Sequence, residues 1–273
     1  MANREQIEKD RISRIHDRVS AQFGAAAAAY TTSPVHSDPD ALRQLVELAQ
    51  PHRSDRALDI ATGAGHAALA LAPRVAEVVA YDMTQPMLRE TARNAAARGL
   101  ANVTTQQGTA ESLPFADASF DIVTVRTAPH HFADVRAAIR EMARVAKPGA
   151  RIIVVDSASP EDASLDRQWN HIEKLRDPSH VRNYTPSEWR SMLADAGLRV
   201  TFEECSLAME NGRPMDFAAW VRRMNTPPAA VEELTRLFRG ASPALAAALR
   251  IEIAVDGAIF FSVPLITLAA VRP

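Results

Sequence analysis

A glycine-rich turn between an apolar strand and an alanine-rich helix constrains this chain more than any other stretch. Residues 57–60 predict a short buried strand, residues 63–65 a tight turn, and residues 67–72 a helix that begins directly after it. Backbone N–H groups and the positive end of a helix face the ligand at such a junction. The sequence therefore predicts an α/β protein with a ligand-binding loop after its first strand.

Two classes of ligand compete for this loop. Gly63, Gly65 and Ala68 fit the dinucleotide pattern G-x-G-x-x-G/A. Asp59, at the end of the strand, would repel a pyrophosphate and attract the ammonium and sulfonium groups of S-adenosylmethionine. Alternatively, Asp59 only caps the loop by accepting hydrogen bonds from backbone N–H groups. The charge of the loop favours S-adenosylmethionine over a nicotinamide dinucleotide.

Composition and charge narrow the class of protein. The chain of 273 residues is 47% hydrophobic and has a formal net charge of -2, which gives no general attraction to nucleic acids or anionic membranes. The single cysteine, Cys205, excludes an internal disulfide, and the 8 histidines show no ligand spacing, so we expect no metal. Residues 1–20 lack an apolar signal segment and residues 259–271 are too short to span a bilayer. We expect a cytoplasmic protein with no membrane span.

Apolar runs alternate with helical patterns along most of the chain. We predict strands at residues 57–60, 75–81, 103–107, 121–125, 151–155, 200–207 and 258–270. Helices are predicted between these strands and at residues 7–29, 40–50, 163–176, 185–197, 214–225, 229–239 and 243–250, with Thr84 as a cap and residues 147–149 as a turn. This alternation implies right-handed crossovers. The predicted fold class is α/β, with a Rossmann-like seven-stranded, mostly parallel sheet, helices on both faces, an N-terminal helical lid and a helical insertion before the last strand.

The expected organisation is one overall domain with three parts. Residues 1–40 are interpreted as a helical lid segment that includes a turn-rich link at residues 30–36, residues 41–160 as the S-adenosylmethionine-binding core, and residues 161–273 as the rest of the sheet with a helical cap. The lid segment could equally be a helix packed outside the sheet. The helices of the last part predict a cap over the carboxyl edge or an oligomer contact, and a homodimer is one candidate assembly.

Asp82 follows the second apolar strand, about 20 residues after the glycine turn, which is the spacing of an acid that accepts hydrogen bonds from ribose hydroxyls. Its alternative role is a helix cap. Met83 offers a polarizable surface for a purine, or ordinary packing. The spacing favours the ribose interpretation.

Several stretches together resemble the motifs of class I S-adenosylmethionine-dependent methyltransferases. They are, in chain order, residues 58–66, 81–83, 108–115, 119–121 and 141–149. The resemblance covers residues 55–160 strongly and the later strands by pattern only. The branch that it most resembles is that of the ubiquinone/menaquinone-biosynthesis methyltransferases and related small-molecule enzymes.

The resemblance implies a set of cofactor-binding residues, whose order along the chain matches the family's motifs. They are Asp59, Ala61, Thr62, Gly63, Gly65, Asp82, Met83, Thr109, Ala110, Glu111, Arg126 and Thr127. Two positions depart from the family pattern. Ala61 replaces the usual first glycine, and Thr109 stands where an Asp commonly binds the adenine amino group. That contact would fall to the Thr109 hydroxyl or to backbone groups.

The reaction implied is in-line transfer of the sulfonium methyl group, to which the protein contributes mainly alignment. A general base is needed only if the acceptor must lose a proton. His130 and His131, after the fourth strand, are the candidates, and we expect at most one of them to face the acceptor. Their alternative role is structural hydrogen bonding. Candidate acceptor-binding residues are Tyr30, His36, His131, Arg182 and Tyr184, with Trp169, His171 and Trp220 in the cap; residues 180–184 could instead anchor a loop.

The leading interpretation is a methyltransferase that acts on a small-molecule acceptor, whose identity and methylated atom the sequence does not specify. The alternatives are an NAD(P)-dependent oxidoreductase that uses the same loop and a non-catalytic S-adenosylmethionine-binding protein. A nucleic-acid methyltransferase is disfavoured, because the charge is near neutral and no Asn/Asp-Pro-Pro-Tyr segment follows the fourth strand.

Overall fold

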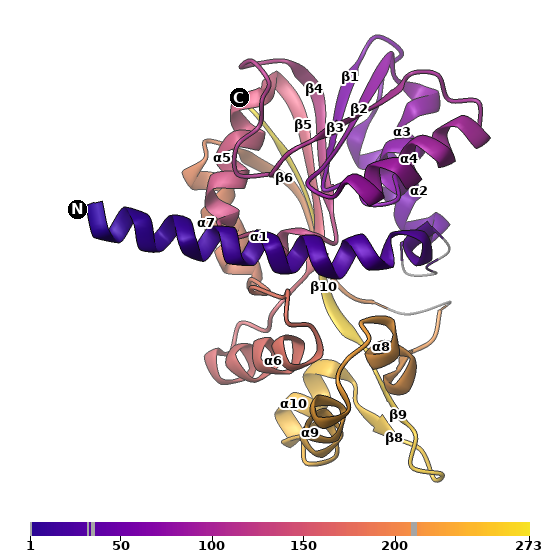
Figure 1. Ribbon diagram of the computed structural model, residues 1–273, viewed down its shortest axis with the longest axis vertical. Coiled ribbons are helices and arrows are strands. Elements are labelled where there is room, and N and C mark those ends of the chain that lie inside the picture. Colours follow the sequence, from indigo (N-terminus) through magenta and orange to yellow (C-terminus); the bar gives the residue numbers. More distant parts are fainter. Residues whose placement is uncertain (1, 32, 34–35, 209–211) are drawn as a thin grey trace.

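A seven-stranded sheet forms the centre of the larger part of the molecule (Figure 1). The computed structural model describes residues 2–31, 33, 36–208 and 212–273. The strands of this sheet are β1 (Arg56–Ile60), β2 (Glu77–Asp82), β3 (Val103–Gln107), β4 (Phe120–Arg126), β5 (Ala146–Ser157), β6 (Arg199–Ala208) and β10 (Val263–Val271). Their order is β3-β2-β1-β4-β5-β10-β6, and among these described strands β10 alone runs in the direction opposite to the others. The predicted mostly parallel, seven-stranded sheet is confirmed.

Helices cover both faces of this sheet and build a smaller module beside it (Figure 1). They are α1 (Ala2–Thr31), α2 (Pro39–Ala49), α3 (His66–Leu71), α4 (Gln85–Ala97), α5 (Val135–Val145), α6 (Ala163–Arg176), α7 (Pro186–Asp195), α8 (Phe217–Arg223), α9 (Pro228–Arg239) and α10 (Pro243–Leu249), with 3-10 turns η1 (Ala72–Arg74) and η2 (Pro129–His131). The capping box that starts α7 at Thr185 is present as predicted. Within the described residues, no helix combines the length and apolarity needed to cross a membrane.

Neighbouring residues of each central strand pack into different cores. On β1, Leu58 belongs to the core shared with α5 and α7, whereas Ala57 belongs to the core shared with α2 and α3. Successive side chains of a strand point to opposite faces of the sheet. Both faces of β1 are therefore covered, which explains why it reads as a continuous apolar run.

The last part of the chain differs from the prediction. The predicted helix at residues 214–225 begins with a strand, β7 (Met215–Asp216), and the predicted strand at residues 258–270 is two strands, β9 (Ile259–Phe261) and β10, separated by Ser262. The Ser262 N–H donates to the carbonyl of Leu249 (2.7 Å), so the chain leaves one sheet and enters another there. A continuous run of apolar residues does not show that the chain passes from one sheet to another.

The strand β9 belongs to a second, three-stranded sheet with β7 and β8 (Glu252–Ile253), which the sequence analysis did not foresee. This sheet packs with α6, α8, α9 and α10 around its own core, in which Trp169, Trp220, Phe238 and Phe261 are almost fully buried. The segment between β6 and β10 returns to its starting point, because Ala208 and Val263 are cross-strand partners.

Two local predictions change in the larger part. Thr84 stands at the N-cap of α4, but its side chain makes no capping hydrogen bond to the described backbone, and its own N–H is bound by Asp82. Residues 147–149, predicted as a turn before the fifth strand, form a bulge inside β5, where Gly149 has a φ of 80°.

The N-terminal helix α1 is a single element that runs between the main sheet and the smaller module (Figure 1). Arg11 Nη2 donates to the carbonyl of Ala133 (3.0 Å), and Gln22 Nε2 donates to that of Met224 (3.1 Å). These bonds attach α1 to both parts of the molecule. The lid role of residues 1–40 stays a prediction, and residues 1, 32 and 34–35 of that segment lie outside the described residues.

Candidate active site

A cavity of about 950 Å³ lies where the carboxyl ends of β1, β2 and β4 meet α1. Most of the predicted cofactor-binding residues line it. They are Asp59, Ala61, Thr62, Gly63, Asp82, Met83, Thr109, Ala110, Glu111, Arg126 and Thr127. The side chains that follow parallel strands meet at one edge of the sheet, and this edge is where open α/β folds place their ligands.

Gly65 is the predicted cofactor residue that lies outside the described lining of this cavity. It is the N-cap of α3 with a φ of 90°, and a Cβ built on it would lie 2.8 Å from Thr91 Cγ2. Gly65 is thus required for the close packing of α3 on α4. The earlier glycine, Gly63 (φ 57°), lines the cavity, and a Cβ built on it would meet no described atom within 4 Å.

Asp59 is buried at the end of β1, and both of its carboxylate oxygens accept hydrogen bonds. Thr62 Oγ1 (2.6 Å) and the Ala68 N–H (3.1 Å) donate to Oδ2, and Thr124 Oγ1 (2.7 Å) donates to Oδ1. Burial raises the pKa of Asp59, although these bonds oppose the shift. The loop-capping alternative describes this contact pattern, so the charge of Asp59 is a weaker reason to choose between ligands than the sequence suggested.

Asp82, at the end of β2, accepts hydrogen bonds from a different set of donors. Oδ2 accepts the N–H of Gly63 (2.9 Å) and Oδ1 accepts the N–H of Thr84 (2.8 Å), while the residue lines the cavity. Burial raises the pKa of this carboxyl group as well, against the effect of the two backbone bonds and of a bond from the Thr84 side chain. A carboxylate has about four lone-pair positions. With these three donors, Asp82 keeps capacity for a further hydrogen bond from a hydroxyl group.

The loop at residues 108–111 closes one end of the cavity. Tyr81 Oη donates to the carbonyl of Thr109 (3.3 Å), and a Cβ at Gly108 would lie 1.8 Å from that hydroxyl, so only glycine fits there. Glu111 Oε1 accepts the N–H of Ala133 (2.9 Å), and Oε2 lies 3.4 Å from His16 Nε2 on α1. Burial alone would raise the pKa of Glu111, but His16 and the backbone donors hold it below its ordinary value.

A second cavity of about 720 Å³ adjoins the first. Five residues line both cavities: Phe23, Tyr30, His36, Thr127 and His131. The second cavity is also lined by His130 and by Trp220 of α8. The structure thus brings together the candidates Tyr30, His36, His130, His131 and Trp220 from segments that are far apart in the sequence.

The two candidate bases occupy η2, with ring centroids 4.1 Å apart, and both line the second cavity. A 3-10 turn does not alternate its side chains as a strand does, so both rings can line one cavity. The expectation that at most one of them faces the acceptor stays a prediction. His130 Nδ1 lies 2.6 Å from Asp156 Oδ1, and the His130 N–H donates to Asp156 Oδ2 (2.9 Å). Burial would lower the pKa of His130, but the Asp156 carboxylate raises it above the ordinary value. The pKa of His131 is well below the ordinary value, because of burial and the neighbouring His130.

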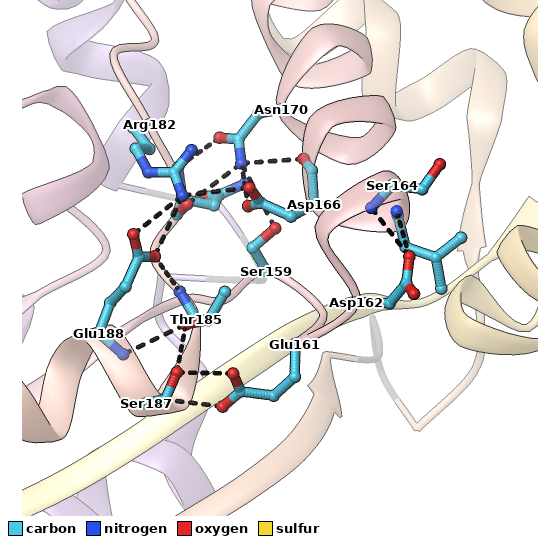
Figure 2. Close-up of polar contacts among 12 residues, drawn as sticks. Ser159, Glu161, Asp162, Ser164, Asp166, Asn170, Arg182, Thr185, Ser187 and Glu188 are labelled. Atoms are coloured by element: carbon cyan, nitrogen blue, oxygen red, sulfur yellow. Dashed lines mark hydrogen bonds and ion pairs between the residues drawn. The ribbon is translucent and has the colours of Figure 1, made fainter.

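Arg182 and Tyr184 were predicted to bind the acceptor, but neither is among the described residues that line the two cavities. Figure 2 shows Arg182 between two carboxylates: Nη2 lies 3.1 Å from Asp166 Oδ2 and 3.0 Å from Glu188 Oε1. Tyr184 packs edge-on against Trp189. The loop-anchoring alternative accounts for both side chains. Trp169 is buried in the core of the smaller module, and His171 is exposed on α6.

Each cavity also has lining residues that were not predicted from the sequence. His16, Val19 and Phe23 of α1 line the first cavity. Ile15, Val19 and Phe23 follow one another at i, i+4 spacing, and this apolar stripe was a signal that could have found the buried face of α1. Glu173, Arg176 and His180 line the second cavity, and no local pattern marks them.

Comparison with known proteins gives concordant matches. Residues 58–154 match the family model described as a methyltransferase domain. The Bacillus subtilis protein YcgJ, described as an uncharacterized methyltransferase, is 42% identical over 209 residues, which are 75% of this chain and 79% of YcgJ. Its crystal structure superimposes with a TM-score of 0.79 at 37% identity, over 85% of this chain and 98% of that chain.

Two further relatives match shorter parts of this chain. Escherichia coli YafE, an uncharacterized protein, is 44% identical over 178 residues, which are 65% of this chain and 84% of YafE. The demethylmenaquinone methyltransferase of Thermus thermophilus is 42% identical over 120 residues, which are 43% of this chain and 54% of that enzyme. The similarity to the quinone-modifying enzyme is thus confined to a shorter stretch.

Proposed function

This chain belongs to the family of S-adenosylmethionine-dependent methyltransferases, and from that premise we propose that it binds S-adenosylmethionine in the first cavity and methylates a small molecule held in the second. The single observation that carries the cofactor assignment is Asp82, a buried carboxylate at the end of β2 that lines the first cavity with capacity for a further hydrogen bond. The family matches give no support to an oxidoreductase or to a non-catalytic binding protein.

The residues of the first cavity fit an adenosine that carries a methionine tail. Asp82 would accept a hydrogen bond from a ribose hydroxyl, and the open backbone at Gly63 leaves space for the methionine end. Met83 and the loop from Thr109 to Glu111 would flank the adenine.

When bound, S-adenosylmethionine supplies a sulfonium methyl group that a nucleophile accepts. The contribution of this chain is to hold that group in line with the acceptor, which can account for about 7–11 kcal/mol of the barrier. Phe23, Tyr30 and His131 line both cavities and so stand at their junction. These side chains would exclude water from the path of transfer.

The segment 1–40 is proposed to act as a lid. Its helix α1 supplies His16, Val19 and Phe23 to the wall of the first cavity, and His66 Nε2 lies 3.0 Å from the carbonyl of Tyr30. A ligand enclosed by these groups would leave only after α1 moves. This arrangement supports a closed state that forms over the bound cofactor.

Isothermal titration calorimetry tests the proposal. S-adenosylhomocysteine should bind with one site per chain, whereas NADH and NADPH should give no heat above dilution, because the family matches are to methyltransferases. Tighter binding of either dinucleotide than of S-adenosylhomocysteine would overturn the assignment. Release of S-adenosylhomocysteine in the presence of a metabolite extract, beyond that of a boiled-protein control, would then demonstrate transfer.

A further inference from the structure

The second cavity is lined by both apolar and polar side chains. Its apolar lining residues include Phe23, Met215, Trp220, Met224, Val263 and Leu265. His130, Ser157 and His180 are among its polar lining residues. A mixed lining of this kind matches a molecule with an apolar body and a polar group, because a buried polar group requires a hydrogen-bond partner.

His130 is held in one orientation by a carboxylate that is almost completely buried. Asp156, 1% exposed, contacts both the ring and the backbone N–H of His130 at 2.6 and 2.9 Å. The carbonyl of His130 accepts the N–H groups of Val181 and Arg182 at 2.9 and 3.1 Å. With Nδ1 engaged by Asp156, Nε2 is the ring nitrogen left to act on a ligand, and the second cavity is the space that His130 lines.

We propose that the second cavity takes an uncharged acceptor with an apolar, ring-sized body and an acidic hydroxyl group, and that His130, oriented by Asp156, removes the hydroxyl proton during methyl transfer. This inference rests on the proposed function of the first cavity. It adds the class of acceptor and a pair of residues, His130 as the base and Asp156 as its positioning residue.

The step balances as follows. The O–H bond of the acceptor breaks and its proton goes to His130 Nε2, while an electron pair of the acceptor forms the new bond to the methyl carbon. The bond from that carbon to sulfur breaks and its pair stays on sulfur, which becomes neutral. The imidazolium is stabilised by the Asp156 carboxylate and later returns its proton to water.

The charged residues that line the second cavity balance one another, which suits an uncharged acceptor. Glu173 and Asp177 are carboxylates, and Arg176 and Arg223 are cations. Arg176 is paired with Glu173 (3.0 Å) and lies over the Trp220 ring (4.5 Å).

The titratable and charged groups that face His130 come from several elements. They are Asp156 of β5, His131 of η2, Glu173 and Arg176 of α6, Asp177 and His180 after α6, His36 before α2, and Arg223 of α8. The carboxylates among these groups favour the protonated ring of His130. Burial lowers the pKa of His180 to about 2, so His180 stays neutral. A neutral His130 is the form that accepts a proton, so turnover falls as the pH drops through its pKa, which lies above 6.5.

The experiment uses 4-nitrophenol as the probe, because its ionisation is visible as the yellow phenolate, and nitrobenzene as the matched probe without a hydroxyl. The full chain is first saturated with S-adenosylhomocysteine. We expect both probes to bind, and bound 4-nitrophenol to show more phenolate than free probe at the same pH. In H130Q and D156N that excess should disappear while nitrobenzene binding persists.

The control is H52Q, because His52 is also paired with an aspartate (Nδ1 3.6 Å from Asp55 Oδ2) but lies in the turn before β1, outside both cavities. H52Q should behave as the wild-type chain does. If probe binding fails in a chain that binds S-adenosylhomocysteine, or if the phenolate excess survives H130Q, the acceptor inference is overturned while the proposed function stands. If S-adenosylhomocysteine itself does not bind, the proposed function fails.

An NMR titration gives a second readout that depends on neither probe. The pKa of His130, followed at its ring Cε1–H, should lie above 6.5 in the wild-type chain and fall in D156N, since the carboxylate is the group that raises it. With a hydroxylated aromatic acceptor found by screening, H130Q should lower the rate about 100-fold or more. An unchanged His130 pKa in D156N would refute the positioning role of Asp156.

Discussion

Two buried carboxylates accept hydrogen bonds around the glycine loop, and their donors differ. Asp59 accepts hydrogen bonds from Thr62, Ala68 and Thr124, whereas Asp82 accepts them from the Gly63 N–H and from the backbone and side chain of Thr84. Both residues line the first cavity. A motif names the two acids but does not state which donors reach each of them.

Asp82→Asn should weaken S-adenosylhomocysteine binding about 10- to 100-fold, because hydrogen bonds to a charged group contribute about 1.5–3 kcal/mol. Calorimetry measures the change. The control is Asp195→Asn, since Asp195 is exposed and paired only with Arg136 among the contacts described. Equal affinity of the Asp82 variant and the control would contradict the ribose role.

Gly65→Ala should destabilise the fold by about 1–3 kcal/mol more than Gly99→Ala, as measured by urea unfolding. Both glycines have positive φ (90° and 66°), so both variants carry backbone strain. Only the Cβ at position 65 also meets a described atom, Thr91 Cγ2 at 2.8 Å. The double variant Gly65→Ala/Thr91→Ser should recover part of the loss. Equal losses at positions 65 and 99 would show that packing on α4 is not the reason for this glycine.

At the scale of elements, α1 connects the cavities to the rest of the molecule. It supplies lining residues to the first cavity and is fastened outside that cavity by Arg11, whose Nη2 donates to the carbonyl of Ala133. If this helix is the lid, its attachment controls the rate of ligand exchange more than the equilibrium affinity. A variant that removes the Arg11 hydrogen bond therefore tests whether α1 is a lid.

Arg11→Ala should speed both association and dissociation of S-adenosylhomocysteine several-fold, with a small change in Kd, since one hydrogen bond contributes about 1 kcal/mol. Stopped-flow fluorescence follows both rates. Arg14→Ala is the control, because Arg14 is exposed on the same helix. Identical rates in the two variants would remove the support for a lid.

The elements of the cofactor side could be predicted from sequence because each is local. The loop after β1 and the acid that ends β2 are each encoded within a few consecutive residues, as is the capping box of α7 elsewhere in the chain. The change from one sheet to the other at Ser262 could not be predicted. The Ser262 N–H donates to the carbonyl of Leu249 instead of to a neighbouring strand, but the residues on both sides of Ser262 are apolar. The ion pair of Arg182 could not be predicted either, because its partner Asp166 lies on α6 whereas Arg182 lies in the connection between α6 and α7.

At the scale of the whole molecule, the two cavities differ in how they are built. The first is made mainly by the main sheet and α1, whereas the second also draws on α6, α8 and β10. The first could be anticipated from the resemblance to a family, and the second appeared only once these segments were placed together. A cytoplasmic location and a homodimer stay predictions.

The pairing of Ala208 with Val263 means that the segment between β6 and β10 starts and finishes at the two residues of one cross-strand pair. The Cα atoms of such a pair stay about 5 Å apart whatever connects them. A different segment could therefore be grafted between these two residues without disturbing the strands that carry Asp59 and Asp82. Because Met215, Trp220 and Met224 of this segment line the second cavity and not the first, such a graft would change the second cavity alone.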